Sequence, residues 1–148
     1  MFYRYKIFEN DESLSLFMKQ NSFDYKKILL LTENVTLDIP NEEKNIYSNV
    51  TINNYSENRI DLTVETEENG LLWLSEIWYP AWKAFVDGEK TEIKIADYSF
   101  RAIEVPKGKH QIKFIFSSTY FKIGLFFTVL TLLICSIALI REFKFINR

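Results

Sequence analysis

Apolar and polar residues alternate along most of the first 118 positions, in short segments separated by turn signals. A period of two is typical of strands that bury one face and expose the other. The alternation is clear in Arg59–Thr66 and Gln111–Phe116, while Lys26–Thr32 is an almost continuous apolar run that suits a strand buried on both faces. About eight short strands are therefore expected, drawn from ten candidate segments. The candidate segments are Phe2–Phe8, Lys26–Thr32, Val35–Ile39, Asn49–Tyr55, Arg59–Thr66, Leu71–Ile77, Trp82–Val86, Thr91–Ile95, Phe100–Val105 and Gln111–Phe116.

One helix is expected near the start of the chain. Asn10-Asp11 offers an N-cap, and Leu14, Phe17 and Met18 recur at helical spacing, which predicts a short amphipathic helix over Glu12–Gln20. Closely spaced strands with turns between them predict a mostly β fold, an antiparallel β-sandwich of jelly-roll or Greek-key type with one short N-terminal helix.

The stretch Ser75–Gly88 concentrates aromatic residues around a proline. Trp78, Tyr79 and Trp82 surround Pro80, and the segment ends in an Asp-Gly pair that favours a tight hairpin turn. Proline cannot donate to a sheet ladder, so it marks a kink or a strand boundary. The aromatic residues there either lock the core of the sandwich or line a surface that binds a ligand.

The last part of the chain has a different pattern. Ile123–Ile140 contains no charged residue, and with Tyr120 and Phe121 the apolar segment reaches a length of about 20 residues, enough for a helix to span roughly 30 Å. We expect a sandwich domain over 1–118, a transmembrane helix over 119–141 and a short basic tail over 142–148. The alternative is a buried helix of a soluble protein, which would normally have one polar face. The basic residues after the span place the C-terminus in the cytoplasm and the head outside the cell membrane.

Composition excludes several functions. The formal net charge is −2 with basic residues gathered in the tail, so the head is mildly acidic and nucleic acid is not an expected partner. Cys135 is the only cysteine, which leaves no internal disulfide and no cysteine-based metal site. His110 is the only histidine, and the sequence identifies no residue that would orient it for catalysis. No cofactor, metal or catalytic set is expected.

The chain resembles the C-terminal part of the YfhO-type bacterial membrane proteins over nearly its whole length, weakly from Tyr3–Phe8 onward and specifically over Leu74–Phe116. Their pattern is a Tyr-Pro-Gly-Trp-Lys-Ala segment ending in Asp-Gly, then Ala-Asn-Tyr with Phe-Arg-Ala, then Pro-x-Gly-x-His. The matching residues here are Leu74-Ser75, Tyr79-Pro80, Trp82-Lys83-Ala84, Val86-Asp87-Gly88, Ala96, Tyr98, Phe100-Arg101-Ala102, Pro106, Gly108, His110 and Phe114. Two positions depart from the pattern: Ala81 stands where glycine is usual, and Asp97 where asparagine is usual.

The resemblance implies a function. That family looks like multi-pass glycosyltransferases with lipid-linked sugar donors that act on cell-envelope polymers such as teichoic acids. Their catalytic carboxylates lie on loops of an N-terminal membrane half that this sequence does not contain. We therefore expect a non-catalytic accessory module that holds an acceptor glycan near the bilayer. The alternative is a structural subunit that docks on a multi-pass membrane partner; an enzymatic role for this stretch itself lacks a visible acid–base set.

The residues most suited to holding a ligand are Tyr79, Trp82, Asp97, Tyr98 and Arg101. Aromatic rings can stack on the C–H faces of sugars, and of the aromatic set we expect Tyr79 and Tyr98 to be the most accessible. Arg101 could bind a phosphate or carboxylate with its fork of donors, or it could form an ion pair with Asp97 or Asp87 inside the fold.

Overall fold

The computed structural model describes residues 1–19, 24–42 and 45–146. It divides into two compact units, Met1–Ser117 and the helical segment from Ser118 onward, which are considered separately.

The first sheet contains five strands in the order β1-β2-β8-β9-β5. They are β1 (Tyr5–Ile7), β2 (Leu29–Leu31), β8 (Lys94–Ala96), β9 (Phe100–Val105) and β5 (Gly70–Ile77). β1 and β2 pair in parallel, and the other neighbours are antiparallel. All three residues of β2 are buried, which confirms the expectation of a strand covered on both faces.

The second sheet also contains five strands, in the order β3-β4-β10-β6-β7. They are β3 (Ser48–Ser56), β4 (Arg59–Thr66), β10 (Gly108–Phe116), β6 (Trp82–Val86) and β7 (Glu89–Thr91), all antiparallel to their neighbours. The expected hairpin turn at Asp87-Gly88 joins β6 to β7, with both residues at positive φ. In β3 the pairing register shifts between Ile52 and Asn54, so Asn53 forms a bulge.

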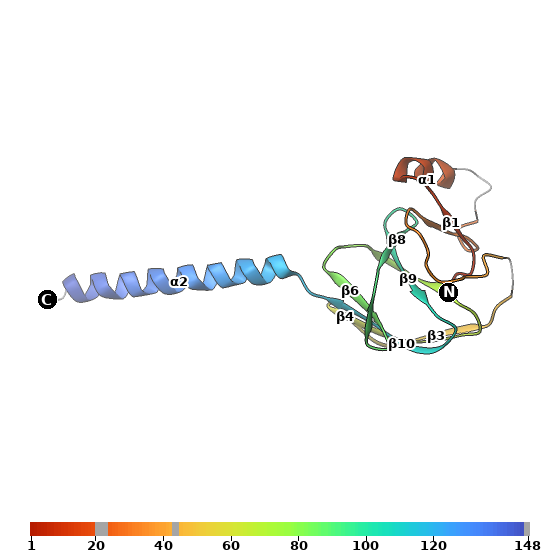
Figure 1. Ribbon diagram of the computed structural model, residues 1–148. Coiled ribbons are helices and arrows are strands. Elements are labelled where there is room, and N and C mark those ends of the chain that lie inside the picture. Colours follow the sequence, from red (N-terminus) through yellow and green to blue (C-terminus); the bar gives the residue numbers. More distant parts are fainter. Residues whose placement is uncertain (20–23, 43–44, 147–148) are drawn as a thin grey trace. The chain divides into compact units, whose positions relative to one another are not determined.

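The two sheets face each other across one apolar core (Figure 1). Its residues come from both sheets: Ile60, Leu62, Val64, Leu72, Ala84, Ile103, Val105, Ile112 and Phe114. A second cluster lies on the other face of the first sheet, where Ala102 and Leu71 meet Ile39 and the half-buried Leu37. The N-terminal residues therefore add a third layer. The predicted mostly β, antiparallel sandwich with a short N-terminal helix, α1 (Asp11–Met18), is confirmed, with the parallel pair β1–β2 as the exception.

Helix α1 begins as expected. The Asn10 side chain accepts a hydrogen bond from Ser13 N at 2.9 Å, and Leu14 is buried. Of the other residues expected on the apolar face, Phe17 is half-buried against Phe8 and Met18 is 38% exposed. Gln20, the expected last residue of the helix, lies outside the described residues.

Two strand predictions were wrong. Val35–Ile39 forms no strand, because the backbone N–H groups of Thr36 and Leu37 donate to the side chain of Glu104 instead of to a neighbouring strand. The strand expected over Thr91–Ile95 is two strands in different sheets. Thr91 pairs with Ala84 in the second sheet, and Lys94 pairs with Ala102 in the first, so the chain crosses between the sheets at Glu92 and Ile93.

The second unit is one helix, α2 (Thr119–Ile146). Its segment Thr119–Arg141 is long enough to cross a membrane and contains an 18-residue stretch with a mean hydropathy of 2.7. The hydroxyls of Thr128, Thr131 and Ser136 each donate to the carbonyl four residues earlier, so they satisfy their polarity within the helix.

Candidate functional site

The five residues expected to hold a ligand have very different exposures. Tyr79 and Tyr98 are 55% and 57% exposed, in agreement with the expectation that they are accessible. Trp82 is half-buried, whereas Asp97 and Arg101 are buried. The set therefore does not form one accessible surface, and a ligand-binding role stays a prediction for the two tyrosines.

Arg101 lies in the core between the two sheets with none of its surface exposed. Its guanidinium stacks over the Trp82 ring at 4.2 Å and lies 5.6 Å from the ring centre of Phe114. Its ion-pair partner is Glu76, not Asp97 or Asp87 as considered from the sequence. Glu76 reaches it because β5 carries extra residues between Leu74 and Ile77, where the register with β9 shifts.

This arginine is incompletely paired. Its Nε and Nη1 atoms are buried and have no hydrogen-bond partner among the described residues. Burial lowers the pKa of the Arg101 guanidinium, and the Glu76 carboxylate opposes that shift. The group stays charged, since arginine does not deprotonate in proteins. Glu76 also accepts a hydrogen bond from the Tyr55 hydroxyl, so it links β3 to β9 through β5.

Asp97 fastens the turn between β8 and β9 to β2. Its carboxylate accepts a hydrogen bond from Leu30 N at 3.1 Å, and its own N–H donates to Leu30 O at 2.9 Å. Asp97 and Tyr98 both have positive φ, which non-glycine residues seldom adopt and which asparagine tolerates well. Burial raises the pKa of the Asp97 carboxyl, with the Leu30 hydrogen bond opposing the shift.

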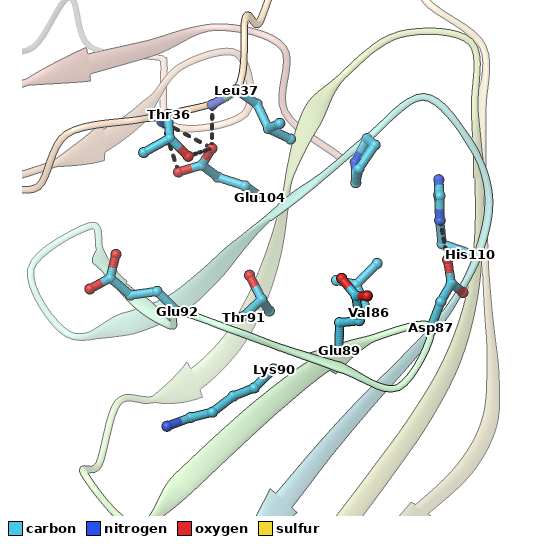
Figure 2. Close-up of a pocket in the computed structure, with 11 residues that line it drawn as sticks. Thr36, Leu37, Val86, Asp87, Glu89, Lys90, Thr91, Glu92, Glu104 and His110 are labelled. Atoms are coloured by element: carbon cyan, nitrogen blue, oxygen red, sulfur yellow. Dashed lines mark hydrogen bonds and ion pairs between the residues drawn. The ribbon is translucent and has the colours of Figure 1, made fainter.

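A cleft of about 600 Å³ brings together residues from separate motif segments of the sequence (Figure 2). Val86 and Asp87 come from the end of β6, and Pro106 and His110 from the turn before β10 and its start. Asp87 is the orienting partner of His110 that the sequence did not reveal: its Oδ2 lies 2.6 Å from His110 Nδ1. Asp87 directly follows β6 and His110 lies in β10, and these two strands are neighbours only in the folded sheet.

Asp87 and His110 also form hydrogen bonds with backbone groups of the neighbouring segments, and these bonds hold the two turns together. Asp87 Oδ1 accepts a hydrogen bond from Gln111 N at 2.8 Å, and Asp87 N donates to Gln111 O. The other ring nitrogen of His110 lies 3.2 Å from Lys107 O. The Gln111 and His110 hydrogen bonds lower the pKa of the Asp87 carboxyl despite a small opposing effect of burial. An acid–base dyad needs a ring nitrogen that faces a substrate, and here both nitrogens face acceptors of the fold.

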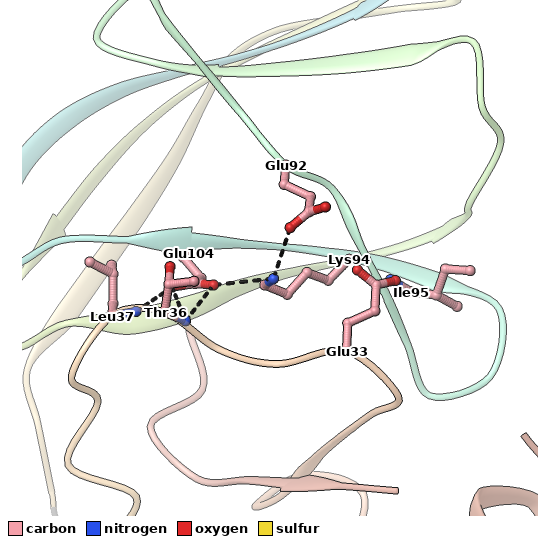
Figure 3. A network of polar contacts seen from close by, with 7 residues as sticks. All are labelled: Glu33, Thr36, Leu37, Glu92, Lys94, Ile95 and Glu104. Carbon is pink, nitrogen blue, oxygen red and sulfur yellow. Dashed lines mark hydrogen bonds and ion pairs between the residues drawn. The ribbon is translucent and has the colours of Figure 1, made fainter. Parts of the chain in front are cut away.

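The carboxylate of Glu104, at the opposite wall of the cleft, also has its oxygens hydrogen-bonded within the fold (Figure 3). Glu104 accepts hydrogen bonds from Thr36 N, Thr36 Oγ1 and Leu37 N at 2.6–3.0 Å, and its Oε1 lies 3.3 Å from Lys94 Nζ. Burial raises the pKa of the Glu104 carboxyl, but these hydrogen bonds outweigh it and hold the pKa below its ordinary value.

Lys94 is the cation of this network and is itself buried. Burial lowers the pKa of its amine, but Glu92 and Glu104 outweigh that effect and raise the pKa above 10.5. Neither Glu104 nor Lys94 was singled out from the sequence. A charged residue at an inward position of a central strand is the signal that could have found them.

A groove of about 610 Å³ crosses the outer face of the second sheet. Phe85 and Ile115 supply apolar surface, and Arg59, Asp61 and Lys113 supply charge. A hydrogen-bonded row runs along it: Asn53 Nδ2 donates to Thr63 Oγ1 at 2.7 Å, and that hydroxyl lies 3.3 Å from Gln111 Oε1. Three adjacent strands, β3, β4 and β10, thus present amide, hydroxyl and charged groups beside an aromatic ring.

No group of three metal-binding side chains occurs in the part of the chain that the structure describes. Comparison with known proteins identifies one relationship: the family model described as bacterial membrane protein YfhO matches residues 4–128. No curated protein and no solved structure matches the chain significantly. The match covers the sandwich and the first part of α2, and the chain therefore belongs to the YfhO family of bacterial membrane proteins.

Proposed function

We propose that this chain is a non-catalytic, extracytoplasmic accessory domain of a YfhO-type, glycosyltransferase-like membrane protein, and that it holds a cell-envelope glycan, such as a teichoic-acid-type polymer, beside the membrane. The observation that carries the proposal is the outer-face groove, which combines an aromatic ring with amides and charges of both signs. Of the residues first considered, Tyr79, Trp82, Asp97, Tyr98 and Arg101, the two exposed tyrosines stay a predicted binding site, and the groove is the site proposed first.

The chemistry of the groove suits a polymer of sugars and phosphates. The half-buried Phe85 ring offers a flat apolar surface for a sugar ring. Asn53 and Gln111 can donate to and accept from hydroxyl groups. Lys113 and Arg59 can attract phosphate, although Arg59 is already paired with Asp61 at 2.8 Å.

The engaged state of the acidic residues supports a non-catalytic role. Both oxygens of Asp87 and both oxygens of Glu104 accept hydrogen bonds or ion pairs from the fold. Glycoside chemistry needs a pair of carboxyl groups that face the scissile bond from two sides. In the cleft of Figure 2 the carboxylates of Asp87 and Glu104 are occupied with backbone and side-chain donors instead.

The proposal is tested by titrating the full chain, reconstituted in lipid nanodiscs, with teichoic-acid fragments and observing NMR shifts. Saturable shifts that are lost in Phe85→Ala and Gln111→Ala, and retained in Tyr98→Ala, support the groove as the site. Loss in Tyr98→Ala alone moves the site to the exposed tyrosines. A folded chain that shows no saturable shift with any fragment overturns the glycan-holding role.

The extracytoplasmic position of the head rests on the basic residues that follow the span in the sequence. A Cys135→Ser, Lys107→Cys variant allows a direct test in intact cells, since residue 107 is exposed. Labelling by a membrane-impermeant thiol reagent supports the proposed orientation. Labelling only after the cells are permeabilised would reverse it.

A second candidate function is docking on a multi-pass membrane partner, and one observation favours it. Strand β3 has exposed apolar side chains, Val50, Ile52 and Tyr55, beside a groove of about 300 Å³ that β4 and β5 complete. Polar substitution at Ile52 should then release the chain from a co-purified YfhO-type partner while the fold is retained. Unchanged co-purification would remove this candidate.

A further inference from the structure

One end of the sandwich exposes apolar and aromatic side chains on two neighbouring turns. Ile77, Tyr79 and Tyr98 are 73%, 55% and 57% exposed, and we refer to them as the tyrosine tip. The two turns are joined by a hydrogen bond from Trp78 N to Ser99 O at 2.7 Å. Exposed apolar groups gathered at one place on a domain mark a surface that another phase or molecule covers.

The chain leaves the sandwich at the same end. Phe116 stacks on Tyr79, with ring centres 6.0 Å apart, and Ser117 N donates to Ala81 O at 2.8 Å. The next residue, Ser118, is the N-cap of α2, because its Oγ accepts a hydrogen bond from Phe121 N at 3.2 Å. Consecutive Cα atoms lie about 3.8 Å apart, so no spacer separates the sandwich from the apolar helix.

We propose that the tyrosine tip lies in the interfacial layer of the bilayer that α2 crosses. Tyrosine suits that layer, since its ring is apolar and its hydroxyl can reach water or headgroups, and tyrosine is enriched at membrane interfaces. The absence of a spacer brings this end of the domain to the membrane surface, whatever angle the helix makes with the sandwich. The inference rests on α2 spanning the membrane and is independent of glycan binding.

The far end of the sandwich has a different surface and provides the control. β10 runs from the far end at Gly108 to Phe116, a length of about 27 Å at the usual rise per residue. The exposed residues at the far end include Glu67, Lys107 and Lys109. Charged side chains of this kind stay in water, so this end should be free of lipid contact.

The test uses the full chain with Cys135 replaced by serine and a single new cysteine at position 79, 98 or 107 (Tyr79→Cys, Tyr98→Cys or Lys107→Cys). Each variant is labelled with a small environment-sensitive fluorophore and reconstituted in phosphatidylglycerol–phosphatidylethanolamine vesicles. Quenching is then measured with lipids that carry a spin label near the headgroup and, separately, with aqueous iodide. We expect several-fold stronger lipid quenching at positions 79 and 98 than at 107, and the reverse with iodide.

Equal lipid quenching at all three positions would overturn the proposal. Protection of positions 79 and 98 from both quenchers would also overturn it, because a protein surface would then cover the tip. Circular dichroism and thermal melting establish that each variant is folded. If a tyrosine position does not tolerate the change, Ile77→Cys offers a more exposed position on the same tip and keeps the test decisive.

Discussion

Two ion pairs among the described residues have a buried cation, and they differ in how completely their polar atoms are satisfied. Glu104 and Lys94 form a closed network in which the carboxylate has donors from Thr36, Leu37 and Lys94 (Figure 3). Arg101 and Glu76 form an open one, in which two guanidinium nitrogens have no partner among the described residues. A closed network stabilises a unique arrangement, whereas a buried cation with unpaired donors contributes little net stability.

The difference follows from what each network connects. The closed network fastens a strandless segment, residues 33–37, onto the outer face of the first sheet, with Glu33 adding a hydrogen bond from Ile95 N at 3.2 Å. The open pair lies between two sheets that an apolar core already holds together. The first should therefore be required for the local fold, and the second should be replaceable.

The largest effect is expected for Glu104→Gln. The amide keeps one acceptor but presents a donor toward Thr36, Leu37 or Lys94, and it leaves the buried Lys94 without its buried partner. Breaking a buried ion pair costs about 3–5 kcal/mol. Urea unfolding of the full chain in detergent measures it. The matched control is Glu92→Gln, which removes the exposed partner of Lys94 and should cost less than about 1 kcal/mol. Equal losses in the two variants would contradict the assignment.

The same carboxylate should give a pH-dependent stability. Its pKa is lower in the folded state than the ordinary 4.5, so its contribution is fully present above 4.5 and is lost as the pH falls through the folded value. The stability difference between the native chain and Glu104→Gln should therefore shrink as the pH is lowered below 4.5. Unfolding curves collected from pH 7 to pH 3 check this. A difference that stays constant over that range would mean that the charge of Glu104 does not carry the effect.

A smaller effect is expected for Arg101→Met. The substitution removes two unpartnered donors and retains an unbranched apolar chain over Trp82, while the partly exposed Glu76 keeps its hydrogen bond with Tyr55. The loss should be about 1 kcal/mol, mainly from the lost stacking on Trp82. Glu76→Ala should cost more, because it leaves the buried guanidinium without a carboxylate. If Arg101→Met costs as much as Glu104→Gln, the distinction between the two networks fails.

The smallest effect, and the only gain, is expected for Asp97→Asn. The pKa of Asp97 is raised in the fold, so its ionisation costs stability as the pH rises above about 3.8. Asparagine keeps the acceptor for Leu30 N, carries no charge and tolerates the positive φ. The melting temperature should rise slightly at pH 7 and not at pH 3. A lower melting temperature at pH 7 would show that the carboxylate has a favourable partner.

The sequence predicted strands correctly where apolar and polar side chains alternate. It predicted the structure less well where backbone groups bond to side chains that are distant in sequence. Arg59–Thr66 and Gln111–Phe116 become β4 and the main part of β10, because one apolar face predicts a half-buried strand. The segment Val35–Ile39 has a strand-like pattern, but its N–H groups bond to a carboxylate about 68 positions away in sequence. Local sequence patterns do not indicate hydrogen-bond partners that are this distant in sequence.

The candidate site shows the same limit. Tyr79 and Tyr98 were expected to be the most accessible of the aromatic residues, and both are exposed. The burial of Arg101 was not decided, because its partner Glu76 reaches it only through the irregular pairing of β5 and β9. The Asp87–His110 pair was also missed: 22 residues separate the two in sequence, and only the pairing of β6 with β10 brings them together.

The bulge at Asn53 has a consequence for how the protein behaves at high concentration. β3 is an edge strand, and it pairs with β4 on one side only. A straight edge with exposed Val50 and Ile52 would be a template for strands of other copies, and so for self-association into extended sheets. The bulge interrupts the regular spacing of the outward N–H and C=O groups. Deleting Asn53 should straighten the edge and make the domain aggregate, even if the sandwich itself remained as stable as before.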